Sequence, residues 1–268
     1  MQKITYKDQD IKLYLLSAGE YYSDAGAAMG VLPRKLWDQK IKLDFDFCMK
    51  FELNCLLIKT NNHNILVDTG IGENYTEKQK RIYKPSKFLL LEELIATGTP
   101  KEDIDYVILT HLHFDHTGGI LSKDNRLNFP NAEYIIQQSE FEIALNPDIL
   151  NQSAYPLKSH YELLKNHNKL HLINNDYQLN KEITIKKTSG HSKGMQIVEI
   201  NSNDDMVCFS GDLFPTRFHL NPAVTSAYEV NRETIIKEKI NIIDRLNKTQ
   251  GRLILGHEKE SPILKFPL

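Results

Sequence analysis

The sequence predicts a layered α/β domain, and three observations lead to this prediction. The 268-residue chain is 41% hydrophobic and 25% charged, which is the profile of a globular protein with a sizeable core. Short strand-like runs recur along it, with segments of helical periodicity between them. No fixed-period repeat, low-complexity tract or long Gly/Ser linker interrupts this alternation. We therefore expect a single domain over residues 1–268.

Eight runs predict strands, because each is short and apolar or β-branched, and several are bounded by Gly, Asn or Asp. They are residues 55–58, 65–68, 106–110, 134–137, 183–188, 196–200, 206–210 and 253–255. Helices are expected at four places, marked by an N-cap residue, by capping-box spacing or by apolar residues at helical intervals. They are 87–97 capped by Ser86, a helix opened by Ser139 with Glu142, a helix opened by Ser159 with Glu162, and 233–246.

Two stretches, residues 20–47 and 146–168, lack a sustained period and are rich in aromatic, Pro and polar residues. Long irregular segments in compact domains serve as lids and binding loops, and equally as surface excursions. If these two are binding loops, apolar side chains within them line a pocket. The candidates are Met29, Leu32, Trp37, Tyr155 and Leu157.

Charge and hydropathy exclude two classes of partner. Lys and Arg total 33 against 35 for Asp and Glu, a net charge of −2, so no basic excess is available for a phosphate backbone or an anionic bilayer. No apolar run approaches the roughly 20 residues that span a membrane, and the N-terminus lacks a signal-peptide core. We expect no nucleic-acid or membrane partner and a cytoplasmic location. Cys48, Cys55 and Cys208 form no CxxC pair and lie among apolar residues, which predicts reduced thiols.

The segment 106–119 carries the strongest chemical signal, because a buried-strand pattern leads directly into four potential metal ligands. These are His111, His113, Asp115 and His116. For this composition, a chance HxHx[DE]H is expected in roughly 0.002 of sequences. Ligands at the carboxyl end of a buried strand are held rigidly and still reach the surface, where open α/β sheets place their sites.

Three later segments repeat one arrangement, in which a strand and a small residue precede a single ligand-type side chain. The side chains are His191, Asp212 and His257, each directly after a glycine that permits a sharp exit from the strand. One Gly-His after a strand is a weak signal, but four such segments in order predict one site. Five imidazoles and two carboxylates also exceed the needs of a single tetrahedral ion, which predicts two metals.

This ordered set of seven ligands resembles that of the metallo-β-lactamase-fold hydrolase superfamily. The resemblance implies a four-layer αββα sandwich with a dinuclear centre at one end of the paired sheets. It implies that His111, His113 and His191 hold one metal, that Asp115, His116 and His257 hold the second, and that Asp212 bridges them. Residues 67–70 match a family segment whose Asp orients a ligating imidazole, which implies that role for Asp68.

Two divalent cations are the expected cofactors, with zinc first. Imidazole and carboxylate also suit iron, manganese and cobalt, and the set has no thiolate to exclude them. Flavodiiron members of the superfamily generally have Glu where this chain has His113, which argues against an oxygen- or NO-reducing role. Two such cations lower the pKa of a bridging water from about 15.7 towards about 7, which predicts hydrolysis by a metal-bridging hydroxide. Asp115 or Asp212 is expected to carry the proton to the leaving group.

Residues 111–119 and 188–194 resemble most closely quorum-quenching N-acyl homoserine lactonases and their methyl-parathion-hydrolase-like relatives. Softer similarity covers residues 30–37, 53–58, 144–147 and 211–216. One departure bears on mechanism, because some lactonases have Tyr three residues after the bridging Asp, where this chain has Pro215. His219 and Tyr228 follow and carry suitable donors, but such residues more often serve in packing, so the replacement stays open.

The predicted function is hydrolysis of a small-molecule lactone or a related ester. The enzyme alternatives are an arylester or organophosphate triester hydrolase, which the same hydroxide permits, and a glutathione thioester hydrolase. The thioester alternative lacks a Lys/Arg cluster near the C-terminus to hold glutathione carboxylates. A nuclease is disfavoured because no RNA-gripping arm is evident, and a catalytically silent metal-binding protein is the non-enzyme alternative. The family also implies a homodimer. Acyl-chain preference and the metal loaded in the cell stay open.

Overall fold

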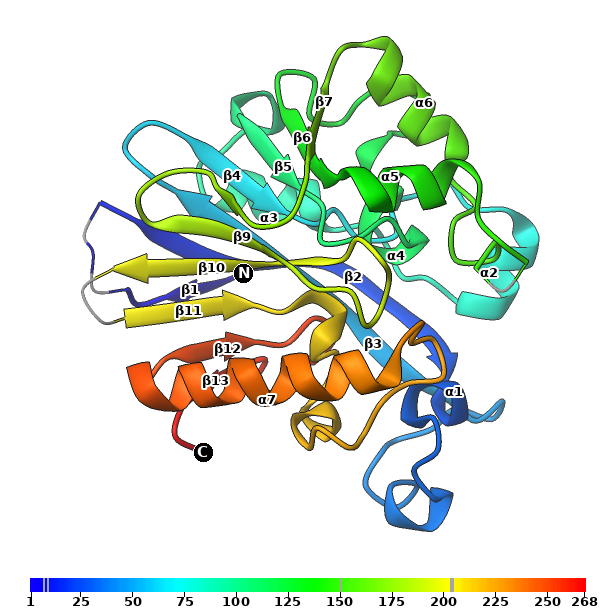
Figure 1. Ribbon diagram of the computed structural model, residues 1–268. Coiled ribbons are helices and arrows are strands. Elements are labelled where there is room, and N and C mark those ends of the chain that lie inside the picture. Colours follow the sequence, from blue (N-terminus) through cyan, green and yellow to red (C-terminus); the bar gives the residue numbers. More distant parts are fainter. Residues whose placement is uncertain (7, 9, 150, 203–204) are drawn as a thin grey trace.

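The computed structural model describes residues 1–6, 8, 10–149, 151–202 and 205–268. Within these ranges two mixed sheets lie face to face, with helices on both outer faces (Figure 1). The first sheet has the order β1 (Gln2–Ile4), β2 (Lys12–Asp24), β3 (Cys48–Lys59), β4 (Asn64–Val67), β5 (Tyr106–Ile108), β6 (Glu133–Gln137), β7 (Leu170–Ile173). The second has the order β13 (Ile263–Lys265), β12 (Arg252–Ile254), β11 (Asp205–Phe209), β10 (Gln196–Ser202), β9 (Ile183–Lys187), β8 (Tyr177–Gln178).

The pairing of neighbouring strands changes once across the first sheet, from antiparallel to parallel. Strands β1 to β4 pair antiparallel, whereas β4 to β7 pair parallel. In the second sheet β11 and β12 are parallel and the other neighbours are antiparallel. Because parallel strands end at the same edge, the loops after β4, β5, β11 and β12 emerge together at one end of the sandwich.

The helices connect strands of the two sheets. They are α1 (Ala25–Met29), α2 (Glu77–Tyr83), α3 (Leu90–Ala96), α4 (Phe114–Thr117), α5 (Gln138–Leu145), α6 (Lys158–Asn166) and α7 (Arg232–Thr249). Short 3-10 turns are η1 (Arg34–Leu36), η2 (Lys101–Asp103), η3 (Gly118–Ile120), η4 (Gly211–Leu213) and η5 (Arg217–Leu220). Helix α7 lies along the second sheet, and α3, α5 and α6 lie on the first (Figure 1).

Three apolar clusters hold these layers together. One fills the space between the sheets, where Leu13 and Ile58 of the first sheet share a cluster with Val198 and Phe209 of the second. Another lies between the first sheet and its helices, and a third lies between the second sheet and α7. Three clusters that separate two sheets and two sets of helices define four layers. The expected αββα sandwich is confirmed.

All eight expected strands are present, as β3 to β6 and β9 to β12, and the run at 55–58 extends to Cys48–Lys59. The long strand β2 was not predicted. Its register with β3 shifts between Ser17 and Glu20, so alternation of buried and exposed residues breaks in mid-strand. The period on which strand prediction depends is lost there.

Three predicted helix starts are wrong. Helix α3 begins at Leu90, and Ser86 instead accepts a hydrogen bond from the backbone N–H of Glu20 at 2.8 Å. Ser139 and Ser159 lie within the first turns of α5 and α6, and neither caps its helix. A genuine capping box joins Thr76 and Gln79 at the start of α2. The helix at 233–246 is confirmed within α7.

The irregular stretches are more ordered than expected. Residues 20–47 contain the end of β2, α1 and η1, and residues 146–168 contain α6. The apolar candidates for a pocket wall belong to the apolar cluster on the first sheet or pack against it: Met29, Leu32, Trp37, Tyr155 and Leu157. Leu157 also lines a small cavity beside Tyr83 and Phe114. Cys55 and Cys208 are buried free thiols, and Cys48 is a half-buried one. Within the described ranges, no helix has both the length and the hydropathy to cross a bilayer.

Candidate metal centre

The seven predicted ligands come together at one end of the sandwich. His111 to His116 occupy the loop after β5 and the start of α4, His191 follows β9, Asp212 lies in η4 after β11, and His257 follows β12. Two glycines let these loops pack closely. Gly211 has a φ of +48°, and a Cβ on Gly256 would lie 2.5 Å from the Gly211 carbonyl oxygen. A side chain at either position would separate the loops that carry the ligands.

Four side chains form a first group, which consists of His111, His113, His191 and Asp212, with ligand atoms within 4.8 Å of one another. His191 Nε2 lies 3.2 Å from His113 Nδ1. Asp212 Oδ2 lies 3.3 Å from His191 Nε2 and 3.9 Å from His111 Nε2. Three ring nitrogens and one carboxylate oxygen therefore converge on one point.

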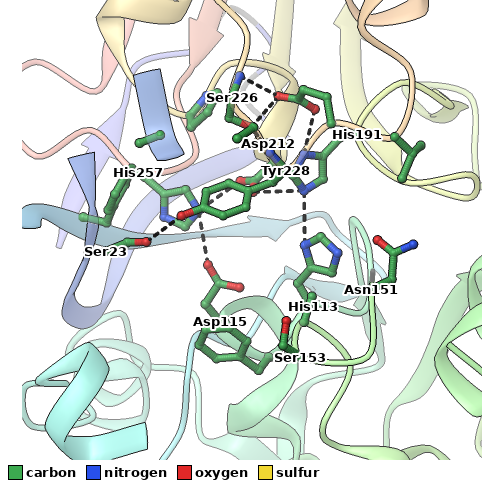
Figure 2. Close-up of a pocket in the computed structure, with 18 of the residues that line it drawn as sticks. Ser23, His113, Asp115, Asn151, Ser153, His191, Asp212, Ser226, Tyr228 and His257 are labelled. Carbon is green, nitrogen blue, oxygen red and sulfur yellow. Dashed lines mark hydrogen bonds and ion pairs between the residues drawn. The ribbon is translucent and has the colours of Figure 1, made fainter. Parts of the chain in front are cut away.

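Three side chains form a second group, which consists of Asp115, His116 and His257. Asp115 Oδ2 lies 3.7 Å from His116 Nε2 and 3.6 Å from His257 Nε2. The other carboxylate oxygen of Asp212 faces this group, with Oδ1 3.3 Å from His116 Nε2 and 2.9 Å from His257 Nε2. Asp212 thus lies between the groups, with one oxygen toward each (Figure 2).

The chemistry of these atoms fits divalent cations. His111 Nε2, His116 Nε2, His257 Nε2 and Asp212 Oδ1 are buried and lack a hydrogen bond. An unsatisfied buried polar atom costs about 1–3 kcal/mol, so four at one place call for a partner of opposite character. Two ligands at about 2.1 Å from a tetrahedral zinc are separated by about 3.4 Å, close to the spacings seen here.

Four of the five imidazoles are held from behind by hydrogen bonds to their second ring nitrogens. The contacts are His111 Nδ1 to Thr110 Oγ1 at 3.1 Å, His116 Nδ1 to Asp68 Oδ2 at 2.8 Å, His191 Nδ1 to Glu229 Oε2 at 3.0 Å and His257 Nδ1 to the Glu52 carbonyl oxygen at 2.8 Å. Such partners fix the tautomer and the ring orientation of a metal-binding histidine. Asp68 lies where the sequence predicts, beside His116, one of the predicted ligands.

Glu140 connects the loops that follow β5 and β9. Its buried carboxylate accepts hydrogen bonds from the Leu112 N–H at 3.0 Å, Tyr155 Oη at 2.7 Å, Ser192 Oγ at 2.7 Å and the Gly194 N–H at 3.1 Å. Leu112 belongs to the loop after β5, and Ser192 and Gly194 to the loop after β9. A single side chain on α5 therefore sets the spacing between ligands from the two sheets.

Burial and neighbouring charges together lower the pKa values of His111 and Asp212. Burial lowers the pKa of His111 well below its ordinary value, and the neighbouring imidazoles lower it further. Burial alone raises the pKa of Asp212, but His257, His116 and His191 outweigh it and hold that pKa well below its usual range. The Asp212 carboxylate is therefore ionised, as a metal ligand would have to be.

A cavity of about 560 Å³ opens above the ligands. One part of its wall is aromatic, formed by Tyr21, Phe51, Tyr83 and Phe114. Another part is polar and includes Asn151, Ser153 and Lys193. Figure 2 shows His113, Asp115, His191, Asp212 and His257 turned toward one another beneath it. The site can therefore receive a small molecule with an apolar part and a polar part.

Two downstream residues considered as donors also border the cavity. His219 is fully engaged, with Nε2 3.1 Å from the Ala28 carbonyl oxygen and Nδ1 2.9 Å from Thr216 Oγ1. Burial lowers its pKa to about 4, so it is a neutral packing residue. Tyr228 places its hydroxyl 3.0 Å from Ser23 Oγ, and both residues line the cavity (Figure 2).

Sequence reasoning missed three residues that touch the ligands or connect their loops, namely Tyr21, Glu140 and Glu229. Tyr21 Oη lies 2.6 Å from Asp115 Oδ2. It lies on β2, whose alternation is broken, and Glu229 stands in an irregular segment before α7. No local pattern marks these positions, because their partners are distant along the chain.

Comparison with known proteins agrees with this geometry. The Metallo-beta-lactamase superfamily profile matches residues 51–257. The N-acyl homoserine lactonase AiiA of Bacillus thuringiensis subsp. kurstaki is 27% identical over 272 residues, which cover 96% of this chain and 97% of AiiA. A crystal structure of a probable metal-dependent hydrolase from Staphylococcus aureus is 30% identical, with a TM-score of 0.90 over 97% of this chain and 94% of that one.

The fold extends to more distant proteins. AidC, a dizinc quorum-quenching lactonase, has a TM-score of 0.80 at 22% identity, over 99% of this chain and 94% of AidC. The matched profile begins in β3 and ends at the last predicted ligand, His257, so it spans both sheets and all seven ligand positions. The chain belongs to the Metallo-beta-lactamase superfamily, whose fold it shares with metal-dependent hydrolases.

Proposed function

We propose that the protein is a dinuclear-metal hydrolase that opens an N-acyl homoserine lactone-like ring or cleaves a related ester. The observation that carries this proposal is the placement of Asp212, with Oδ1 2.9 Å from His257 Nε2 and Oδ2 3.3 Å from His191 Nε2. A carboxylate that faces two groups of ligands is suited to bridge two cations. The full-length similarity to proteins named N-acyl homoserine lactonase supports the substrate class.

We assign one cation to His111, His113 and His191, and the second to Asp115, His116 and His257, with Asp212 shared. Zinc is the expected ion, since imidazole and carboxylate are common zinc ligands, and iron, manganese or cobalt suit the same donors. Because the ligands come from loops of both sheets, we also propose that residues 1–268 act as one domain. Neither sheet alone holds a complete ligand set.

When bound, two divalent cations supply a Lewis acid and a water-derived nucleophile at neutral pH. Net ring opening adds the hydroxyl of water to the acyl carbon, breaks the acyl C–O bond and returns one proton to the leaving alkoxide oxygen. Both oxygens of Asp212 face imidazoles, so this residue is held as a bridge. Asp115 is the better proton carrier, because its contacts with ring nitrogens are made by Oδ2, whereas both oxygens of Asp212 face imidazoles.

The two kinds of cavity wall suit the two parts of such a substrate. The aromatic wall of Tyr21, Phe51, Tyr83 and Phe114 would bind apolar groups of the acyl part. Asn151, Ser153 and Lys193 would interact with an amide or a hydroxyl group. A site of this kind orients the substrate by a few polar contacts on a largely apolar surface.

The test is a pH-indicator assay of purified protein of known metal content. It compares N-acyl homoserine lactones of several chain lengths with a phosphotriester, an arylester and S-lactoylglutathione. Preferential lactone opening that His111→Ala abolishes is the expected result. Activity confined to the triester, arylester or thioester would keep the metal site and overturn the substrate class. If the protein binds metal and hydrolyses none of these compounds, the proposal that it is a hydrolase is contradicted.

A further inference from the structure

Tyr21 contacts one ligand of the second group directly. Its hydroxyl donates a hydrogen bond to Asp115 Oδ2 at 2.6 Å, because a carboxylate oxygen can only accept. The same oxygen lies 3.6 Å from His257 Nε2 and 3.7 Å from His116 Nε2. The phenol therefore binds Oδ2, the oxygen of Asp115 that faces the two imidazoles of the second group.

The ring of Tyr21 is fixed by its neighbours. It stacks on Phe51 with ring centroids 5.5 Å apart, and it makes edge contacts with Phe114 at 6.3 Å and His257 at 5.8 Å. Tyr21 is 7% exposed, and it also borders the cavity. A ring packed on three sides holds its hydroxyl in one place, so the contact with Asp115 is built into the fold.

The phenol reaches Asp115 from a different part of the chain than sequence reasoning considered. Tyr21 lies near the end of β2, whereas Asp115 lies on α4. Pro215, in the segment after Asp212, has no side-chain donor, and His219 uses both of its ring nitrogens elsewhere. Of these three residues that border the cavity, Tyr21 places its polar group on a ligand.

We propose that Tyr21 is a positioning residue that holds Asp115 Oδ2 toward the second group and leaves Oδ1 for proton transfer. The proton-transfer part of this inference rests on the proposed function, whereas the effect on the second group does not. Hydrogen bonds behind a metal ligand orient it and adjust its basicity, and their loss costs about 10- to 100-fold in metal affinity or activity. A phenylalanine at this position would keep the packing and remove only the hydroxyl.

The test compares Tyr21→Phe with Tyr22→Phe. Tyr22 is the next residue of β2, its side chain does not border the cavity, and its ring instead lies near the ammonium groups of Lys50 and Lys84. Zinc affinity is measured by competition with a chromogenic chelator, kcat and KM by the hydrolysis assay, and folding by the thermal midpoint. Both variants lose one hydroxyl from the same strand, so a difference between them reports the contact with Asp115.

For Tyr21→Phe we expect one of two zinc ions to bind about 10- to 100-fold more weakly, with a similar fall in kcat. KM should stay within about twofold of wild type, and the thermal midpoint of the metal-free protein should be unchanged, because substrate binding and packing remain. Tyr22→Phe should match wild type in every measurement. Wild-type zinc affinity in Tyr21→Phe would overturn the proposal, as would equal loss of both ions with a lowered midpoint, which indicates a merely structural role.

The zinc measurement separates this inference from the proposed function. If wild-type protein opens no lactone, the substrate proposal fails, and the affinity of the weaker zinc in Tyr21→Phe still decides the role of Tyr21. If wild-type protein opens lactones and Tyr21→Phe equals it in kcat and in zinc binding, the inference about Tyr21 fails alone.

Discussion

His191 and Glu229 form a pair with buried side chains, in which the imidazole Nδ1 donates to the carboxylate Oε2 at 3.0 Å. Glu229 also accepts a hydrogen bond from Ser226 Oγ at 2.8 Å, so its carboxylate is held in place. The pair leaves His191 Nε2 directed at Asp212. A carboxylate behind an imidazole keeps the proton on the nitrogen that it contacts, here Nδ1. The other nitrogen, here Nε2, then becomes a stronger metal ligand.

The substitution Glu229→Gln should therefore weaken zinc binding by the first group of ligands. The amide keeps the volume but removes the negative charge, and we expect about a 10- to 100-fold loss of zinc affinity or kcat. Zinc titration and steady-state kinetics measure both. The matched control is Glu233→Gln, because Glu233 is exposed on α7 and pairs only with Lys237 in the described structure. Equal effects of the two substitutions would contradict the assigned role.

The substitution Asp68→Asn should weaken zinc binding by the second group of ligands. Asp68 Oδ2 contacts His116 Nδ1 at 2.8 Å and Thr110 Oγ1 at 2.8 Å, while Oδ1 accepts from the Thr110 N–H at 2.7 Å. An amide can present at most one acceptor oxygen to these three donors, so at least one is left unsatisfied. We expect loss of one zinc ion per chain in metal analysis, with Asp103→Asn, an exposed site, as control. Two tightly bound ions in Asp68→Asn would count against this reading.

Glu140→Gln should destabilise the fold and the site together. Each oxygen of this carboxylate accepts from two donors, and the amide would replace one oxygen by an NH2 group that cannot accept. A buried donor left without a partner costs about 1–3 kcal/mol. We expect a lower free energy of unfolding in urea and a fall in kcat. Glu142→Gln on the exposed face of α5 is the control. A stable variant with full activity would show that Glu140 does not set the loop spacing.

Lys239 should make stability rise with pH between about 8 and 10. Its buried ammonium donates to the Val224 carbonyl oxygen at 2.7 Å, and burial lowers its pKa from 10.5 to about 8, with Glu229 opposing the shift. The unfolded chain therefore binds more protons in this range, and stability increases as pH rises. The increment relative to Lys239→Met is about 2 kcal/mol between pH 8 and 10.

Urea unfolding at a series of pH values measures that increment. Lys237→Met, an exposed substitution on the same helix, should keep the wild-type dependence. If wild type and Lys239→Met show parallel curves from pH 8 to 10, the depressed pKa of Lys239 is wrong. Lys239 belongs to neither group of predicted ligands, so this test probes the packing beneath the 221–230 segment, which includes Glu229.

Local patterns predicted the ligands and most of the strands. His111, His113, Asp115 and His116 stand in one short motif, and His191, Asp212 and His257 each follow a glycine at a strand end. These signals can be read from residues that are neighbours in sequence. The fold then brings the strand ends together, where sites of α/β proteins lie. The structure brings all seven together as the sequence predicts.

The supporting residues could not be predicted in the same way. Tyr21 and Asp115 are 94 positions apart, and Glu229 and His191 are 38 apart, so their contacts exist only in the folded chain. The apolar candidates Met29 and Trp37 have the composition of a pocket wall, but packing against the first sheet buries them instead. Hydrophobicity alone does not distinguish a core residue from a pocket residue.

Anomalous diffraction from zinc-loaded crystals of wild type and Asp115→Ala tests the two-metal centre most directly. The account predicts two wild-type peaks about 3.5–4 Å apart, one at His111, His113 and His191 and one at His116 and His257, with Asp212 between them. It predicts that Asp115→Ala keeps only the first peak and loses most turnover. A single wild-type peak, or full turnover in Asp115→Ala with one ion per chain, would contradict it.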